Sequence, residues 1–432
     1  MKKKWIIMAV LLAALSMGSE TVEAGSLKGE RPKKSTPKIS QSVSQPSQSR
    51  GAAKKAETGR SVRDEMSRLK VDERGPIIEV GLLSGQKKAE IKCLTDSEAL
   101  SDGKVWQTYK KGETLSVSQS GDQVSINGKK KKGPVYLAAK KDDGAAFSVK
   151  GNSYRGKIKL QPSAYTSGIT VVNALPMEEY LCGVVPSEVS PSWHEDALKA
   201  QAVAARTYAM FHRDGFRSAG YDVTDDTRSQ VYRGTAVETE ATSRAIVETA
   251  GEIVTSGGKA IDAVFHSNGG GYTENSENVW GSKISYLRGV KEEGSSTVNK
   301  AWTKTVSKSD FERVLDIGSV KKVELSKLKK GPVKAKDRGV SGRVTSFIVQ
   351  GSKGKKSVTG NEIKSWFGLS STLFDLEIKG KNVVFTGYGA GHGLGLSQWG
   401  AEAMAAKHGN GKDYYKTILT HYFTGTKIEK VY

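Results

Sequence analysis

The run HEDALKAQAVAARTYAMFHR, residues 194–213, decides how the middle of this chain folds. It consists mainly of strong helix formers and contains no helix breaker before Gly215. Ser192 and Glu195, three residues apart at its start, predict a capping box. Apolar side chains recur at helical spacing along one stripe: Leu198, Ala202, Ala205 and Ala209. Further apolar residues lie beside this stripe, so the run predicts a largely buried helix.

Two cations, Lys199 and Arg206, lie seven residues apart on an otherwise apolar face of this helix. A buried cation is costly unless it is paired or directed at a polar site. They could form structural salt bridges, to Glu195 or Asp226 for instance, or bind an anionic ligand. The sequence leaves both interpretations open.

Ahead of the helix, VVPSEVSPSW at residues 184–193 predicts a short loop that carries Glu188. Pro186, Pro191 and Trp193 surround this glutamate in sequence. Desolvation by such neighbours would raise the pKa of the carboxyl and make it a usable general acid near neutral pH. The alternative is a solvated loop glutamate without a catalytic role.

The rest of the chain indicates an α+β fold. Residues 76–165 contain short alternating or apolar runs, such as IIEVGLL and AEIKCLT, separated by turn residues, and predict a β-rich region. Residues 166–432 mix predicted strands and helices without a repeated βαβ order, which argues against a doubly wound sheet. We expect the β-rich region to merge into a mixed α/β catalytic core with a groove.

The first 75 residues differ in composition from the rest of the chain. Residues 1–24 have a basic start, an apolar run over 5–15 and a small-residue exit at Ala24, which predicts a cleavable secretory signal. The alternative is an uncleaved membrane anchor, although the run is short of the roughly 20 residues that span a bilayer. Residues 25–75 are rich in Ser, Lys, Arg, Gln and Pro and predict a disordered basic tether. The protein should therefore act outside the cytoplasm.

The formal net charge of +21 favours an anionic partner. Export and the dispersal of the lysines, without interleaved aromatic residues, argue against nucleic acid and favour an anionic cell-wall polymer. A merely soluble basic surface and a binder of anionic lipid remain alternatives. Cys93 and Cys182 could form a disulfide, but the sequence does not show whether they meet. No Cys/His cluster has zinc-ligand spacing, so we expect no metal and no cofactor.

Near the C-terminus, GYGAGHGLGLSQWGA at residues 387–401 has glycine at every second position from Gly387 to Gly395. It lacks the spacing of a dinucleotide-binding loop. The alternation predicts a strand with one bare face, on which a sugar ring or another backbone could approach closely. Ser397 predicts the N-cap of a following helix. His392 is either a hydrogen-bonded structural histidine or part of a groove.

Several stretches together resemble the SpoIID/LytB family of stage II sporulation protein D and amidase-enhancer proteins. They are LPMEEYLCGVVPSEVSPSWHEDALKAQAVAARTYAM, DDTRSQVYRG, FHSNGGGYTENSENVW and GYGAGHGLGLSQWGA, in this order. The resemblance runs from about residue 77 to 423. It implies a peptidoglycan lytic transglycosylase that cuts peptide-stripped glycan strands between N-acetylmuramic acid and N-acetylglucosamine.

The resemblance implies one catalytic acid/base, Glu188. It also implies substrate-binding residues along a groove: Lys199, Arg206, Gln230, Tyr232, His266, Ser267, His392 and Gln398. A Lys199–Arg206 pair could then meet the lactyl carboxylate of muramic acid. This chain lacks the Cys and second His that form a zinc site in some members, so we expect no zinc.

Two functions are left open by the sequence. The first is a secreted, wall-associated lytic transglycosylase whose partner is the glycan strand. The second is a non-catalytic wall-binding protein that stimulates an N-acetylmuramoyl-L-alanine amidase. A third reading, as a nucleic-acid or anionic-lipid binder, depends on charge alone.

Overall fold

The computed structural model describes residues 61–141, 144–293, 300–329, 332–409, 411 and 413–432. The predicted signal at 1–24 and residues 25–60 of the predicted tether lie outside this range. The sequence predicts a disordered tether up to residue 75, but residues 61–75 are folded. Residues 61–75 hold helix α2 (Val62–Ser67) and a 3₁₀ turn (Asp72–Arg74). Met66 and Leu69 are buried, three residues apart, so this polar segment still joins the core through one apolar stripe.

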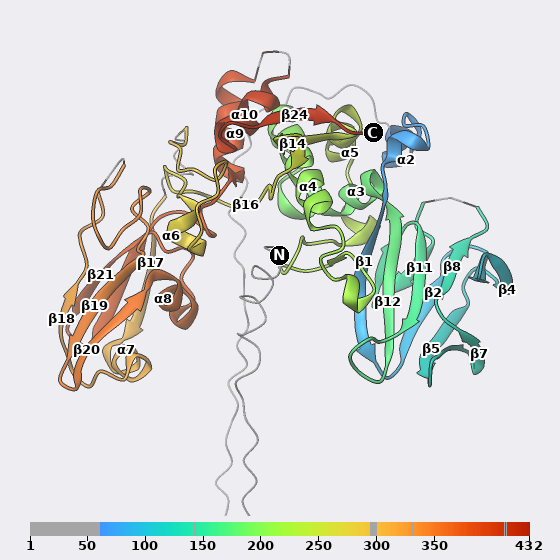
Figure 1. Ribbon diagram of the computed structural model, residues 1–432, viewed down its shortest axis with the longest axis horizontal. Helices are drawn as coiled ribbons and strands as arrows, with labels where there is room; N and C mark the ends of the chain where they lie inside the picture. The colour runs from blue at the N-terminus through green and yellow to red at the C-terminus, as the bar shows by residue number, and fades with distance from the viewer. Residues whose placement is uncertain (1–60, 142–143, 294–299, 330–331, 410, 412) are drawn as a thin grey trace, which may run out of the picture. The chain divides into compact units, whose positions relative to one another are not determined.

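A seven-stranded sheet joins the β-rich region to the rest of the chain (Figure 1). Strand β1 (Ile77–Gln86) pairs antiparallel with β12 (Ile169–Pro176) and parallel with the short β13 (Val223–Thr224). On the other side of β12 the order continues through β11 (Lys157–Pro162), β8 (Val135–Ala139), β3 (Ser97–Ser101) and β4 (Lys104–Tyr109). The boundary we placed at residue 165 thus falls inside one sheet, because strands from both sides of it pair.

A second, six-stranded sheet completes the β-rich region. Its order is β10 (Asn152–Tyr154), β9 (Phe147–Val149), β2 (Ala89–Cys93), β5 (Thr114–Ser120), β6 (Gln123–Ile126) and β7 (Lys129–Lys132). Alternate residues of β2 and β5, such as Ile91, Leu115 and Val117, are fully buried. This is the period-two burial that the sequence predicts for half-buried strands. Cys93 and Cys182 are both buried and both free, so they do not form a disulfide.

The helical part begins directly after β12. Helix α3 (Met177–Glu188) packs against α4 (Glu195–His212) and α5 (Glu240–Glu248). The predicted helix at 194–213 is confirmed, but its capping box is wrong. The N-cap is His194, whose Nδ1 accepts the backbone N–H of Asp196 at 3.2 Å. The backbone N–H of Trp193 instead closes a turn on the carbonyl of Ser190, so the helix begins only after that turn.

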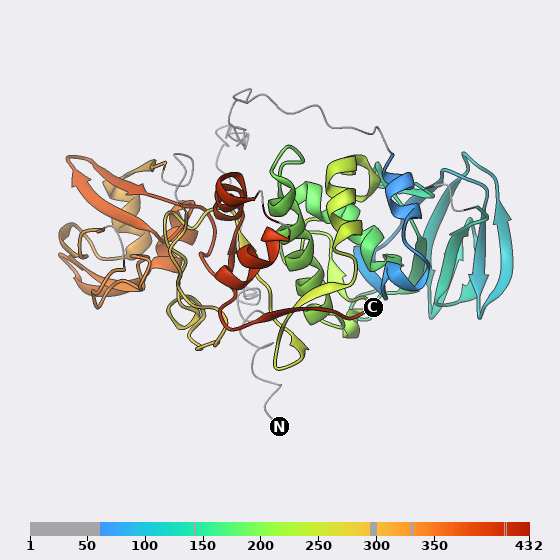
Figure 2. The same ribbon diagram turned by 90° about the horizontal axis from the view of Figure 1, so that it is seen from above.

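Helices α9 (Gln398–His408) and α10 (Tyr414–Tyr422) pack on α4 from the C-terminal part of the chain. Strand β24 (Lys427–Lys430) pairs with β14 (Glu252–Ser256), which also pairs with β15 (Lys259–Ala260). Figure 2 shows β24 in dark red leading to the end marked C. The side chains between these elements form a core separate from that of the β-rich region.

A third core lies in residues 302–387. One sheet has β22 (Asn382–Gly387) between β17 (Trp302–Ser307) and β21 (Phe374–Lys379). The other has β19 (Ser346–Gly351) between β18 (Val320–Glu324) and β20 (Gly354–Thr359). Helices α7 (Lys308–Leu315) and α8 (Gly360–Phe367) complete this core around Phe311, Phe367 and Phe385. Helices and strands are thus mixed throughout, and the predicted α+β fold is confirmed. Among the described residues, no helix is both long and apolar enough to cross a membrane.

The glycine-rich segment at 387–395 is not the predicted strand. Only Gly387 ends a strand, and the two-residue strand β23 (Leu396–Ser397) begins after the segment, pairing with β16 (Phe265–His266). Gly389, Gly391, Gly393 and Gly395 all have a positive φ, between 66° and 97°. The period of two therefore comes from alternate left-handed residues rather than from a pleat. A Cβ on Gly393 would lie 2.3 Å from Arg343 Cζ, so the glycines also provide clearance for this chain's own groups.

Candidate active site

Glu188 is the last residue of helix α3, not part of a loop. The helix was missed because it is buried on nearly all sides and contains Gly183 and Pro186, so the apolar pattern of an amphipathic helix is absent. The Ser187 hydroxyl donates to the carbonyl of Gly183 at 2.8 Å. Pro186 offers no N–H to the carbonyl of Cys182 four residues before it, so this side-chain bond helps to hold the last turn. The chain leaves the helix in an extended conformation at Val189, and Glu188 is half-buried at that exit.

The surroundings of Glu188 favour its protonated form. The backbone N–H of Val231 donates to Oε1 at 3.2 Å, and no described cation lies within ion-pair distance. Burial raises the pKa of Glu188, and the Val231 N–H and the Gln398 amide partly oppose this rise. Gln398 is near enough to affect the carboxylate, but its Nε2 makes no hydrogen bond of standard geometry among the described residues. A carboxyl with one oxygen held and no counter-ion is suited to donate a proton.

Tyr208 from α4 lies beside this carboxyl. Burial raises the pKa of Tyr208, and the charges of Asp262 and Glu188 raise it further. The Tyr208 ring lies 4.1 Å from the ring of His212 and 6.4 Å from that of Phe265, measured between centroids. His212 Nε2 lies 2.9 Å from Asp262 Oδ1. Aromatic rings and a His–Asp pair therefore extend the site away from Glu188.

The start of helix α9 forms another wall. The Ser397 hydroxyl accepts the N–H of Gly400 at 3.3 Å, so the predicted N-cap is confirmed. The N–H of Trp399 donates to the carbonyl of Ser267 at 3.0 Å, and the Ser267 side chain is exposed. The Trp399 ring lies 4.9 Å from that of Trp193, which joins α9 to the segment between α3 and α4. These contacts position Gln398 next to Glu188.

One turn further along α9, Glu402 is a second half-buried carboxylate. It accepts the backbone N–H of His194 at 2.9 Å, and burial raises its pKa to about 6. It therefore holds the first turn of α4 rather than facing Tyr208 or Val231.

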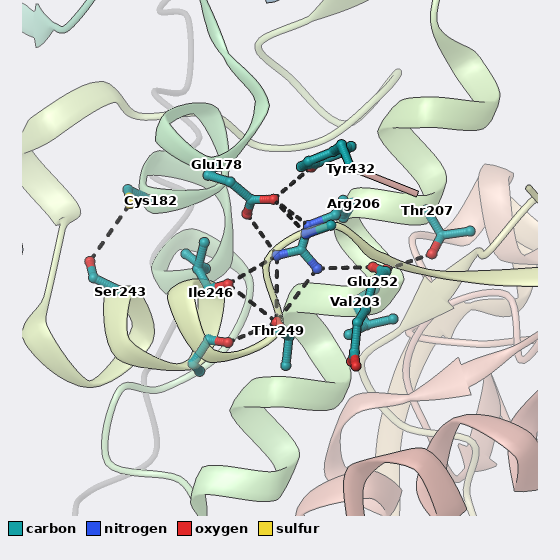
Figure 3. Close-up of polar contacts among 12 residues, drawn as sticks. Glu178, Cys182, Val203, Arg206, Thr207, Ser243, Ile246, Thr249, Glu252 and Tyr432 are labelled. Carbon is teal, nitrogen blue, oxygen red and sulfur yellow. Dashed lines mark hydrogen bonds and ion pairs between the residues drawn. The ribbon is translucent and has the colours of Figure 1, made fainter. Parts of the chain in front are cut away.

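The two helix cations both have internal partners. Lys199 pairs with Glu195, and its Nζ lies 2.8 Å from Glu248 Oε2. Arg206 is fully buried and holds Glu178 through two bonds, Nε to Oε1 at 2.8 Å and Nη2 to Oε2 at 2.7 Å (Figure 3). The Tyr432 hydroxyl donates to the same carboxylate at 2.6 Å.

These contacts correspond to the structural salt bridges that the sequence left open. The partner of Arg206 is Glu178, however, and not Glu195 or Asp226. Its guanidinium lies in the protein interior, which argues against the substrate-binding role that the resemblance implies for it.

Gln230 and Tyr232 are also buried. Gln230 Oε1 accepts the Tyr180 hydroxyl at 3.2 Å, and its Nε2 donates to the carbonyl of Ala205 at 3.3 Å. The Tyr232 hydroxyl donates to Asn173 Oδ1 at 2.8 Å. Both side chains fix the segment whose middle residue, Val231, presents its N–H to Glu188. Val231 thus contributes its backbone N–H to the site, while the side chains of Gln230 and Tyr232 belong to the core.

His266 and His392 lie together, with ring centroids 5.3 Å apart. His392 Nδ1 accepts the N–H of Leu394 at 3.1 Å, so its Nε2 carries the proton and donates to the carbonyl of Phe265 at 3.0 Å. Burial lowers the pKa of His392 to about 4. His266 Nδ1 donates to the carbonyl of Leu394 at 3.0 Å, which leaves its buried Nε2 as an acceptor without a described partner. Burial, helped by the nearby His392 and Arg343, lowers the pKa of His266 well below its ordinary value.

The structure thus brings Glu188 and Gln398 together and places His266, Ser267 and His392 on adjacent segments. Tyr208 and the N–H of Val231 were missed. Tyr208 lies two residues after Arg206 in the predicted helix at 194–213. A backbone donor such as the Val231 N–H has no side-chain signature in the sequence. A cavity of about 840 Å³ lies elsewhere, lined in part by Tyr272, Lys291 and Tyr388. Glu188 does not line it. We take Glu188 as the candidate site because it is a half-buried carboxyl with a raised pKa and no described counter-ion.

The sequence of this chain also matches known protein families. Residues 165–256 match the SpoIID family, described as Stage II sporulation protein, and residues 274–395 match a domain of unknown function, DUF8618. The chain belongs to the SpoIID/LytB family.

Three relatives illustrate the match. Stage II sporulation protein D of Bacillus subtilis (strain 168) is 34% identical over 283 residues, which are 62% of this chain and 78% of that protein. An uncharacterized protein of Brachyspira hyodysenteriae is 33% identical over 322 residues, 73% of this chain and 82% of that protein. The amidase enhancer of B. subtilis is 31% identical over 328 residues, 65% of this chain and 45% of that protein.

Proposed function

We propose that the protein is an exported peptidoglycan lytic transglycosylase that acts on peptide-stripped glycan strands in the cell wall. Glu188 is its single acid/base. The observation that carries the proposal is the state of this carboxyl: half-buried, with a raised pKa, one oxygen held by the Val231 N–H, and no described cation beside it. Membership of the SpoIID/LytB family supports a role at the cell wall.

The reaction requires two proton transfers at one carboxyl. Glu188 gives its proton to the glycosidic oxygen as the bond from C1 of N-acetylmuramic acid to that oxygen breaks. The 6-hydroxyl of the same sugar then forms a bond to C1, and its proton passes to the Glu188 carboxylate. The products are a 1,6-anhydro sugar and a new chain end, no water is consumed, and Glu188 returns to its starting state. A carboxyl with a raised pKa, which can give up a proton and accept another, is suited to both transfers.

A second candidate function is stimulation of a cell-wall amidase without catalysis. The specific observation in its favour is the similarity to the B. subtilis amidase enhancer. The name describes the B. subtilis protein alone, and no feature of the Glu188 site requires an amidase.

The deciding experiment incubates the purified chain with peptide-free glycan strands and looks for 1,6-anhydro products by mass spectrometry. We expect products from the wild type and a roughly 10²- to 10⁴-fold lower rate from Glu188→Gln, the usual range for loss of a general acid. Glu402→Gln is the matched control, since it removes another half-buried carboxyl with a raised pKa and should keep the activity.

Folding is checked by thermal melting against pH. Because burial raises the pKa of Glu188, the folded state binds its proton more tightly, so this residue's contribution to stability falls as pH rises through its pKa. Glu188→Gln should therefore gain stability relative to wild type toward high pH. An absence of anhydro products from folded wild type, together with faster release of peptides by an added amidase, would favour the second candidate.

A further inference from the structure

Lys364 on helix α8 is a half-buried lysine whose ammonium has no ion pair or hydrogen bond to any described residue. Two other lysines that are half-buried or buried have carboxylate partners. Lys199 meets two carboxylates, and Lys159 Nζ lies 2.7 Å from Glu79 Oε2. Burial lowers the pKa of Lys364, and the charge of Arg343 lowers it further. An anion placed beside this lysine would relieve both effects.

The exposed indole of Trp280 belongs to a short helix that contacts α8. The Asn361 amide on α8 donates to the carbonyl of Val279 at 3.5 Å, which joins α8 to α6 (Ser276–Trp280). Lys364 follows Asn361 by three residues and so projects from the same face of α8. Lys364 is also close enough to His392 to lower its pKa, and the ring of His392 lies 5.7 Å from that of Trp280. Trp280 and Lys364 therefore both lie near His392.

This corner is connected to Glu188 by consecutive contacts. His392 Nε2 donates to the carbonyl of Phe265, the Phe265 ring lies 6.4 Å from that of Tyr208, and Tyr208 lies beside Glu188. Trp280 is 45% exposed, so its ring is accessible to a ligand. A flat exposed ring beside an unpaired cation suits a ligand that has an apolar face and an anionic substituent.

Arg343 adds positive potential from below the surface. It is fully buried, and its Nε and Nη2 have no hydrogen-bond partner among the described residues. Its charge is balanced in part by Glu274 and Glu292. Lys364, which is only half-buried, is the cation of the two that a ligand can reach.

We propose that Trp280 and Lys364 form a subsite for an N-acetylmuramic acid residue with a free lactyl carboxylate. The sugar ring stacks on Trp280, and the carboxylate pairs with Lys364. The proposal depends on the proposed function and adds a reason for substrate choice. When a stem peptide is attached, the lactyl group is an amide without charge, so Lys364 loses its partner. Lys199 and Arg206, which are paired internally, cannot supply this recognition.

Binding is measured with the full chain carrying Glu188→Gln, so that the ligand is not cut. One ligand is a peptide-free oligosaccharide of alternating N-acetylglucosamine and N-acetylmuramic acid, and the other is a chito-oligosaccharide of equal length without lactyl groups. Adding Lys364→Gln should weaken binding of the first ligand by roughly tenfold or more, as for loss of a charge-assisted hydrogen bond. Binding of the second ligand should change by less than about twofold. Lys364→Arg should retain most of the affinity.

Trp280→Ala should weaken both ligands by roughly tenfold, since stacking does not depend on the carboxylate. The matched controls are Lys356→Gln and Trp366→Ala, a second lysine–tryptophan pair in which Nζ lies 5.7 Å from the ring centroid. They should leave both affinities unchanged. Equal loss of both ligands in Lys364→Gln, or no loss, overturns the subsite. If the Glu188→Gln protein binds neither ligand, the proposed function itself fails.

Discussion

The two ends of helix α3 carry the same side chain in opposite circumstances. At the first end, Glu178 is fully buried and receives hydrogen bonds from Arg206, Tyr432 and the N–H of Gly251. At the last end, Glu188 is half-buried and receives one backbone N–H, with the Gln398 amide nearby. Twelve residues of one helix thus hold a carboxylate that is fully neutralised and another that is left without a counter-ion.

The difference shows what makes a carboxyl structural or reactive. A guanidinium that binds both oxygens fixes the negative charge and leaves no oxygen free for chemistry. A single backbone N–H orients one oxygen and leaves the other available, while partial burial favours the proton. The cation, rather than the burial alone, separates the two roles. Substitutions at either end of the helix test this distinction.

The largest effect is expected at the first end. Arg206→Met leaves Glu178 buried without its cation, and breaking such a pair costs about 3–5 kcal/mol of unfolding free energy. Urea denaturation measures this loss, and the double variant with Glu178→Gln should recover part of it because the uncompensated charge is gone. A variant that stays as stable as wild type but loses glycan binding would show that Arg206 belongs to the substrate site instead.

A smaller effect is expected from Tyr432→Phe. The ring stays, but the hydroxyl that donates to Glu178 Oε1 at 2.6 Å is removed. Hydrogen bonds to charged groups contribute about 1.5–3 kcal/mol, so denaturation should detect a loss of this size. Tyr165→Phe is the control, since Tyr165 is 68% exposed and should show no change. If both variants behave alike, the Tyr432 hydroxyl does not support the ion pair.

The smallest effect is expected at the other end. Gln398 lowers the pKa of Glu188, so Gln398→Ala should raise that pKa further. The proposed reaction needs the protonated form, and activity is lost as pH rises through the pKa. The alkaline limb of the pH–rate profile, with the rate measured as release of anhydro products, should therefore move to higher pH. A shift to lower pH would contradict the position assigned to Gln398.

Sequence patterns predicted the regular elements well. Strands β1 and β2 follow from the apolar and alternating runs in their sequences, and α4 follows from uninterrupted helix formers. Helix α3 could not be predicted in this way. Its surroundings bury nearly all of its faces, so its sequence has no polar side that would reveal a helical period.

For the site, the sequence indicated Glu188 and Gln398, which the structure brings together. It could not distinguish a cation that faces a ligand from one that faces a buried carboxylate. Helical spacing gives the face on which Arg206 lies, but its partner Glu178 is set by how α3 packs on α4. Donors such as the Val231 N–H are invisible for the same reason, since any residue type provides them.

The alternate left-handed glycines have a consequence for mutational scans. Replacement of Gly389, Gly391, Gly393 or Gly395 by any L-residue should be poorly tolerated, because each has a positive φ and close neighbours. The intervening residues carry no such restriction on handedness, and Leu394 and His392 are restricted by burial and by hydrogen bonds instead. The intolerance of the glycine positions could easily be mistaken for selection on ligand contacts. Here the selection acts on the path of the main chain, and a scan that includes D-alanine by chemical ligation would separate the two causes.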